Sequence, residues 1–218
     1  MVENMMFFML LGVIPFILVA GTSFAKISVV LTIVKNAFGS GGIPPVSVLT
    51  SISVIMTFFI MAPVVQEMVE NIKESTLLQS SDLKNIQDNK NSIETDIVKA
   101  TAVYNIASPP LKTFLKSNTP KAELEYYGKL AHVSKDGYDN IRILLMAFAS
   151  SQLVSALLTG ILVLIPFILV DLITGVTLTA MGLTGISVMT ISLPLKLLVF
   201  IAADGWHLLI NALITSYS

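Results

Sequence analysis

Long hydrophobic runs occupy both ends of the chain and predict membrane-spanning helices. Four hydrophobic stretches cover about 5–34, 46–66, 143–170 and 172–217, and uncharged runs of 20 to 28 residues lie inside them. About 20 mostly apolar residues are enough for a helix to cross the hydrocarbon core of a bilayer. The pattern therefore predicts four or five helical spans, because the last stretch contains a turn signal and can count as one span or two.

Glycine and proline divide these stretches into hairpins. The run Gly39–Pro45 and the run Gly182–Gly185 both read as turns, since consecutive Gly and Pro break helices. Ser192 followed by Pro194 predicts a helix that starts there, with serine as the cap and proline in the first turn. The sequence thus predicts three parts: a hydrophobic hairpin over 1–66, a polar and mainly helical segment over 67–142, and a second hydrophobic hairpin over 143–218.

The distribution of charge supports a membrane protein with one polar segment outside the membrane. Hydrophobic residues make up 54% of the chain and charged residues 12%, and 21 of the 27 charged residues lie between Glu67 and Arg142. A soluble globular chain has about 25% charged residues. We therefore expect an all-α integral membrane protein of helical hairpins; its oligomerisation into a helical pore is an expectation that the family resemblance described below implies.

Several function classes are excluded or disfavoured by composition. A net charge of −1 provides no basic surface for nucleic acid, and the absence of cysteine removes disulfides and thiolate chemistry. The two histidines, His132 and His207, are isolated, so we predict no metal site and no cofactor.

The orientation signal comes from two lysines near the first turn. Cytoplasmic loops are enriched in Lys and Arg, so Lys26 and Lys35 place the 35–45 turn in the cytoplasm and the polar segment on the periplasmic side. The stretch 5–21 resembles a signal peptide, but Glu3 stands where such a peptide carries positive charge, and we expect this stretch to be retained.

The two hydrophobic halves also share a short repeat. Ile14–Val19 recurs as Ile165–Val170, an offset of 151 residues. A duplicated hairpin would explain the repeat, and so would chance similarity between two sequences rich in apolar residues. The two explanations are equally good.

One predicted helix face carries small side chains at every fourth position: Ala147, Ser151, Ser155 and Thr159. In lipid, such faces allow close helix approach and interhelical hydrogen bonds. Contact between subunits is the favoured interpretation, and packing within one monomer is the alternative.

Four charged residues lie within or directly between the hydrophobic stretches: Lys26, Asp171, Lys196 and Asp204. A central Asp or Lys costs roughly 2.5–3.5 kcal/mol on insertion scales, so these groups must face protein, water or the interface. Asp171 and Lys196 are equally far from the Gly182–Gly185 turn, and an antiparallel hairpin would bring them to similar depth. A structural salt bridge is favoured over an ion or proton relay. Ser23 and Lys26 match S-x-x-K, the arrangement of a Ser–Lys hydrolase, without its companion motifs.

The hydrophobic halves resemble the FliP/SctR family, core export-apparatus proteins of flagellar and virulence-associated type III secretion systems. The resemblance lies in these segments: Leu11–Phe16, Gly21–Leu31, Lys35–Gly39, Ser151–Leu153, Pro166–Leu172, Met189–Leu197 and Asp204–Trp206. It covers roughly two-thirds of the chain.

This resemblance implies a non-enzymatic subunit of a helical export gate in the bacterial inner membrane. Its partners would be copies of itself, FliQ/SctS-like and FliR/SctT-like subunits, and the unfolded protein substrates that pass through the pore. The family carries consecutive methionines at the turn between the last two hydrophobic segments, where they form a gasket. Here only the flanking methionines remain, and we expect the constriction to be formed by Met181, Leu183, Thr184, Gly185, Ile186 and Met189. A small-molecule or ion transporter is the first alternative, and a membrane Ser–Lys hydrolase the second.

Overall fold

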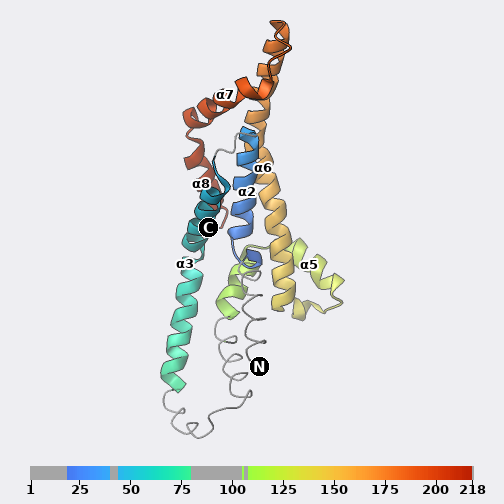
Figure 1. Ribbon diagram of the computed structural model, residues 1–218. Coiled ribbons are helices and arrows are strands. Elements are labelled where there is room, and N and C mark those ends of the chain that lie inside the picture. The colour runs from blue at the N-terminus through green and yellow to red at the C-terminus, as the bar shows by residue number, and fades with distance from the viewer. Residues whose placement is uncertain (1–18, 40–43, 80–104, 106–107, 218) are drawn as a thin grey trace, which may run out of the picture. The chain divides into compact units, whose positions relative to one another are not determined.

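The computed structural model describes residues 19–39, 44–79, 105 and 108–217, and the regular elements in these ranges are all helical, which confirms the all-α prediction. Residues 108–117 are helical as well. The other elements are α2 (Phe24–Phe38), α3 (Val46–Gln79), α5 (Lys121–Leu130), the 3-10 helix η2 (Lys135–Asp139), α6 (Ile141–Ala180), α7 (Val188–Ala202) and α8 (Gly205–Thr215) (Figure 1). The predicted retained N-terminal stretch, most of the first copy of the repeat and the centre of the first turn lie outside the described residues.

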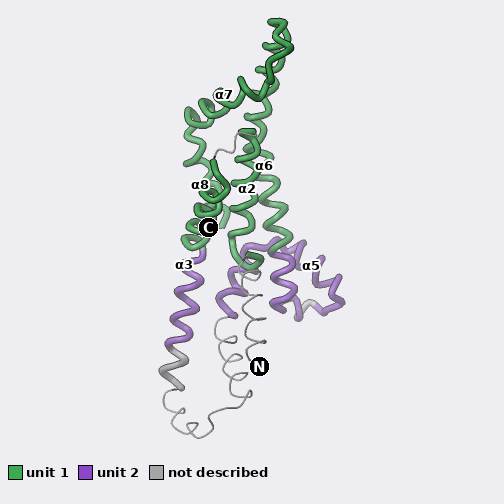
Figure 2. The backbone as a smooth tube through the Cα atoms, in the orientation of Figure 1, with its two compact units in different colours: residues 1–60, 149–218 green, residues 61–148 purple. Residues whose placement is uncertain are grey.

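The chain divides into two compact units (Figure 2). One comprises residues 1–60 and 149–218, and the other comprises residues 61–148. Because α3 and α6 each continue from one unit into the other, the two units share these helices.

The core of the first unit forms around α2. Four of its aliphatic side chains, Ile27, Val30, Leu31 and Val34, are almost completely buried. Helix α6 lies close beside α2, because a side chain at Gly160 would stand 2.4 Å from Ile33. The short apolar helix α2 is therefore an internal element of this unit.

Two helices in the described residues are long and apolar enough to cross a membrane: residues Val46–Lys73 of α3, and α6. Only 22% and 17% of their most hydrophobic windows are buried within the chain. Helices α7 and α8 form a third candidate if they are taken together, although they meet at an angle of 63°.

The predicted turn between α6 and α7 is present, and its hydrogen bonds explain where α6 stops. The Leu183 amide donates to the Leu178 carbonyl, and the Gly182 amide donates to the Thr179 carbonyl. This is the Schellman pattern, which requires a left-handed residue, and Gly182 supplies it with φ of +73°.

The predicted start of the next helix at Ser192 and Pro194 is wrong. Helix α7 begins at Val188 with Ser187 as its N-cap, so Pro194 lies inside the helix. A proline has a helical φ and removes one intrahelical hydrogen bond, and membrane helices tolerate this loss.

The second unit has its own small core. Leu115 and Leu144 are fully buried, and the Phe114 ring packs on Phe148 with centroids 5.7 Å apart. Lys116 donates to Asp139 at 2.7 Å on the exposed surface. Exposed ion pairs add little stability, so the apolar contacts hold this unit together.

Candidate functional site

The predicted constriction residues lie together at the end of the α6–α7 hairpin. Met181, Leu183 and Ile186 are all exposed, and Thr184 and Gly185 between them are exposed as well. No atom lies within 4 Å of the position that a side chain would take at Gly182 or Gly185. The tip, residues 181–187, thus projects beyond the other helices of its unit without support from the rest of the described chain (Figure 1).

Met189 differs from the other predicted constriction residues. It lies in the first turn of α7, and its side chain faces the C-terminal end of α2 at Gly39. It is 44% exposed, so one side of it remains open.

The predicted Asp171–Lys196 pair is present. Lys196 Nζ lies 2.6 Å from Asp171 Oδ2, and the ammonium also donates to the Ala37 carbonyl at 2.8 Å. Lys196 is 3% exposed, whereas the Asp171 side chain is 42% exposed. A cation near the last turn of a helix is stabilised by the helix dipole, so the end of α2 provides a second favourable environment for the buried charge.

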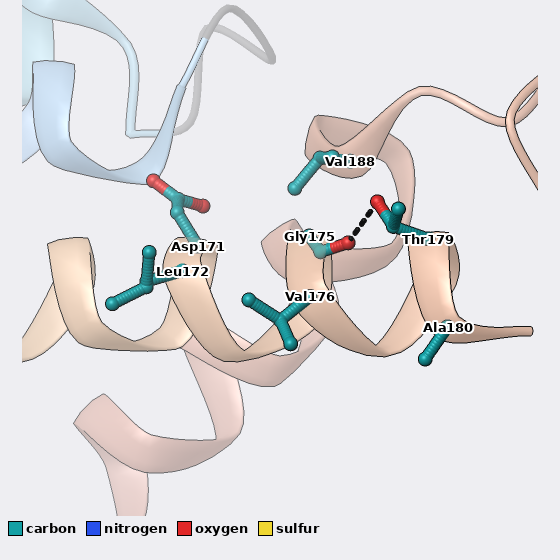
Figure 3. A pocket seen from close by; sticks show the side chains of 7 residues that line it. All are labelled: Asp171, Leu172, Gly175, Val176, Thr179, Ala180 and Val188. Atoms are coloured by element: carbon teal, nitrogen blue, oxygen red, sulfur yellow. Dashed lines mark hydrogen bonds between the residues drawn. The ribbon is translucent and has the colours of Figure 1, made fainter.

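Asp171 stands at one end of an open hollow between α6 and the start of α7 (Figure 3). The hollow has a volume of about 560 Å³ and is lined by Asp171, Leu172, Gly175, Val176, Thr179, Ala180 and Val188. The Thr179 hydroxyl donates to the Gly175 carbonyl, so its proton is already used. The carboxylate is therefore the one charged group in a mainly apolar lining.

Lys26 is buried at a different place in the same unit. Its ammonium donates to Ser216 Oγ at 2.8 Å and lies 4.8 Å from the centre of the Tyr217 ring. The Tyr217 hydroxyl in turn donates to Gln152 Oε1 at 2.6 Å. These contacts tie α2 to α6 and to the residues that follow α8.

The Lys26 cluster contains residues that sequence reasoning missed. Ser216, Tyr217 and Gln152 are polar positions within or beside apolar runs, which was the available signal, but they lie far from Lys26 along the chain. The S-x-x-K match is not assembled as a dyad: Ser23 Oγ is buried without a hydrogen-bond partner in the described structure, and Lys26 donates to Ser216 instead.

Asp204 occupies the bend between α7 and α8. It has φ of +50°, and its exposed carboxylate lies 3.5 Å from His207 Nδ1. The four predicted intramembrane charges thus fall into three separate places, and only Asp171 and Lys196 pair with each other. In the described residues, no group of three or more His, Cys, Asp or Glu side chains could hold a metal ion.

The predicted small-residue face is only partly buried within the chain. Ala147 and Ser151 are buried, whereas Ser155 and Thr159 are half-buried and the Thr159 hydroxyl donates to the Ser155 carbonyl. On the neighbouring positions of α6, Ala156 is fully buried, and a side chain at Gly160 would stand 2.4 Å from Ile33. Contact of the predicted face with other subunits stays a prediction.

Comparison with known proteins gives consistent matches over nearly the whole chain. A sequence profile described as "FliP family" matches residues 7–213. "Flagellar biosynthetic protein FliP" of Buchnera aphidicola subsp. Baizongia pistaciae is 34% identical over 219 residues, which cover 99% of this chain and 56% of that protein. "Virulence protein YscR" of Salmonella typhimurium is 33% identical over 216 residues, which cover 96% of this chain and 93% of that protein. "Flagellar biosynthetic protein FliP" of Bacillus subtilis is 31% identical over 209 residues, with coverages of 94% and 87%. The chain spans about half the length of the two Buchnera relatives it matches.

Proposed function

This chain belongs to the FliP family, and from that premise we propose that it is a pore-forming subunit of a type III secretion export gate, which passes unfolded proteins across the bacterial inner membrane. The membership confirms the family resemblance found in the sequence. The names of its relatives, a flagellar biosynthetic protein and a virulence protein, support an export-apparatus role. The same names favour a structural component over an enzyme.

The observation that carries the pore proposal is the unsupported tip of the α6–α7 hairpin. Its apolar side chains are exposed, with Met181 at 66%, Leu183 at 38% and Ile186 at 43%, and no described atom lies within 4 Å of the position that a side chain would take at Gly182 or Gly185. Apolar residues that meet around an axis can close a pore by excluding water. Several copies of this tip, brought together by assembly, would form such a constriction through Met181, Leu183, Thr184, Gly185, Ile186 and Met189, with the glycines providing flexibility.

The outer faces of α3 and α6 support assembly with other helices. In the described structure, only 22% and 17% of their hydrophobic windows are buried. In the proposed gate these faces contact further copies of the chain together with FliQ/SctS-like and FliR/SctT-like subunits, and the Ala147, Ser151, Ser155 and Thr159 face takes part. The polar segment lies on the periplasmic side.

The proposal predicts that ions leak through the closed gate when a large side chain is removed from the tip. Leu183→Gly, introduced into the gate reconstituted with its partner subunits, is expected to raise the resting conductance of the bilayer several-fold, because it removes an apolar side chain from the constriction. Single-channel or bulk conductance measurements with small ions provide the readout.

Leu130→Gly is the matched control, since it removes another exposed leucine, 63% exposed against 38% for Leu183, from the end of α5 in the other unit. Its conductance is expected to equal that of the unmodified gate. Equal conductance in the two variants would contradict the proposed constriction.

A small-molecule or ion transporter is the second candidate, favoured by the half-exposed Asp171 carboxylate in its open hollow. A transporter works alone, whereas a gate subunit needs its partners. Solute uptake by liposomes that contain this chain alone would therefore favour the transporter and count against the gate.

A further inference from the structure

The C-terminal end of α2 contacts both limbs of the hairpin that carries the tip. The Phe38 ring is 3% exposed and packs edge-on against two other rings. Its centroid lies 4.9 Å from that of Phe167 in α6 and 5.3 Å from that of Phe200 in α7. One side chain of α2 therefore lies between the two limbs.

The residues on either side of Phe38 contact the same hairpin. The Ala37 carbonyl accepts the hydrogen bond from Lys196 of α7, and Lys196 is paired with Asp171 of α6. At Gly39, a side chain would stand 3.3 Å from Met189 Cε, so the methionine lies directly against the backbone there. Three consecutive residues of α2 and its cap thus engage α6, α7 or both.

Among the described residues, the hydrogen bonds of the tip are local, within the turn and to the adjoining ends of α6 and α7. Its glycines face open space, and its side chains are exposed. In a hairpin whose far end is unsupported, the position of that end follows from the separation and angle of the two limbs. Packed contacts fix such a separation, because interiors have few voids and resist deformation.

We propose that Ala37, Phe38 and Gly39 form a wedge that sets the separation of α6 and α7 and thereby positions the tip, so that movement of the end of α2 is transmitted to the tip. The wedge is a property of this chain alone. Its consequence for conduction rests on the proposed function, and the two can be tested apart.

The test measures the distance between the limbs in the full-length chain in lipid nanodiscs. Spin labels are placed at Thr177→Cys in α6 and Ile191→Cys in α7, both exposed positions in a chain without native cysteine. Pulsed electron paramagnetic resonance then reports the distance distribution. Phe38→Ala is expected to shift this distribution and to broaden it about twofold, because packed contacts hold a single arrangement. Phe38→Leu, which refills most of the space, is expected to restore the narrow distribution.

Phe114→Ala is the matched control, because it removes a buried aromatic side chain that packs on another ring in the other unit. It is expected to leave the distance distribution unchanged. A distribution that is the same in Phe38→Ala as in the unmodified chain would overturn the wedge.

If Phe38→Ala does not accumulate in the membrane, a second variant tests the wedge. Met189→Ala truncates a half-exposed side chain and removes the contact with Gly39. It is expected to broaden the distribution by a smaller amount, and no broadening would overturn the wedge. A broadened distribution without increased conductance in the reconstituted gate would retain the wedge and count against the proposed constriction.

Discussion

At the scale of single residues, the buried lysines show what local sequence can and cannot specify. The partnership of Lys196 with Asp171 follows from their equal spacing around one turn, and the structure contains it. The second acceptor of Lys196, the Ala37 carbonyl, lies 159 positions away, and the acceptor of Lys26 lies 190 positions away. No periodicity in the sequence relates such positions, because they meet only when α2 packs among the later helices.

A pair of glycines provides a residue-scale prediction. A side chain at Gly205 would stand 2.3 Å from the Phe200 ring, so Gly205→Ala has to displace that ring from its contact with Trp206. Overpacking of this kind costs about 1–3 kcal/mol. The midpoint of thermal unfolding in detergent is expected to fall.

Gly185→Ala is the comparison, because nothing lies within 4 Å of the position its side chain would take. Its unfolding midpoint is expected to stay at the unmodified value. A similar fall in both variants would show that glycine itself, and not the close approach to Phe200, is what matters.

At the scale of elements, the hydrophobic pattern predicted which segments are helical. It was less accurate about where each helix ends and which other helices it contacts. It identified the α6–α7 turn, but it placed the start of α7 near Pro194 instead of Val188. Proline in a first turn and proline inside a membrane helix look alike in sequence, since the flanking residues are apolar in both. The small-residue face of α6 is buried at Ala147 and Ser151 and half-buried at Ser155 and Thr159, and its role in contacts between subunits stays a prediction.

The close approach of α2 and α6 at Gly160 gives an element-scale prediction. Gly160→Leu is expected to push Ile33 away and lower the unfolding midpoint, because its side chain enters the space that Ile33 fills. Adding Ile33→Ala makes room for the leucine and is expected to recover much of the loss. Thermal unfolding of the single and double variants measures this coupling. Strictly additive effects would mean that the two positions do not share this space.

At the scale of the whole molecule, the hydrophobic runs and the charge distribution predicted the helical class, and the resemblance of particular segments predicted the family. Both predictions are confirmed. The partners of each apolar face could not be predicted in the same way. A leucine that faces lipid and a leucine that faces another subunit are chemically identical. Hydropathy therefore predicts that both are shielded from water, but it does not distinguish lipid from protein as the neighbour. The bend at Asp204 was also missed, because a left-handed aspartate leaves no hydrophobic signature.

Membrane orientation is testable with two exposed positions. Tyr126→Cys lies in the polar segment, and Ser47→Cys lies in the first turn of α3, beside the turn that Lys35 is expected to hold in the cytoplasm. An impermeant maleimide added to intact spheroplasts is expected to label Tyr126→Cys, and to label Ser47→Cys only after the membrane is permeabilised. The native chain, which has no cysteine, is the unlabelled control. The reverse pattern would invert the proposed topology.

The 63° bend between α7 and α8 has a consequence for the surrounding bilayer. With 15 and 11 residues, these helices are about 22 and 16 Å long at 1.5 Å per residue, and each is shorter than the hydrocarbon core, which is about 30 Å thick. Lipid that meets this pair must thin toward it to avoid hydrophobic mismatch. The membrane would then dimple along this edge of the protein, and the lipid leaflets would be closer together there than elsewhere around it.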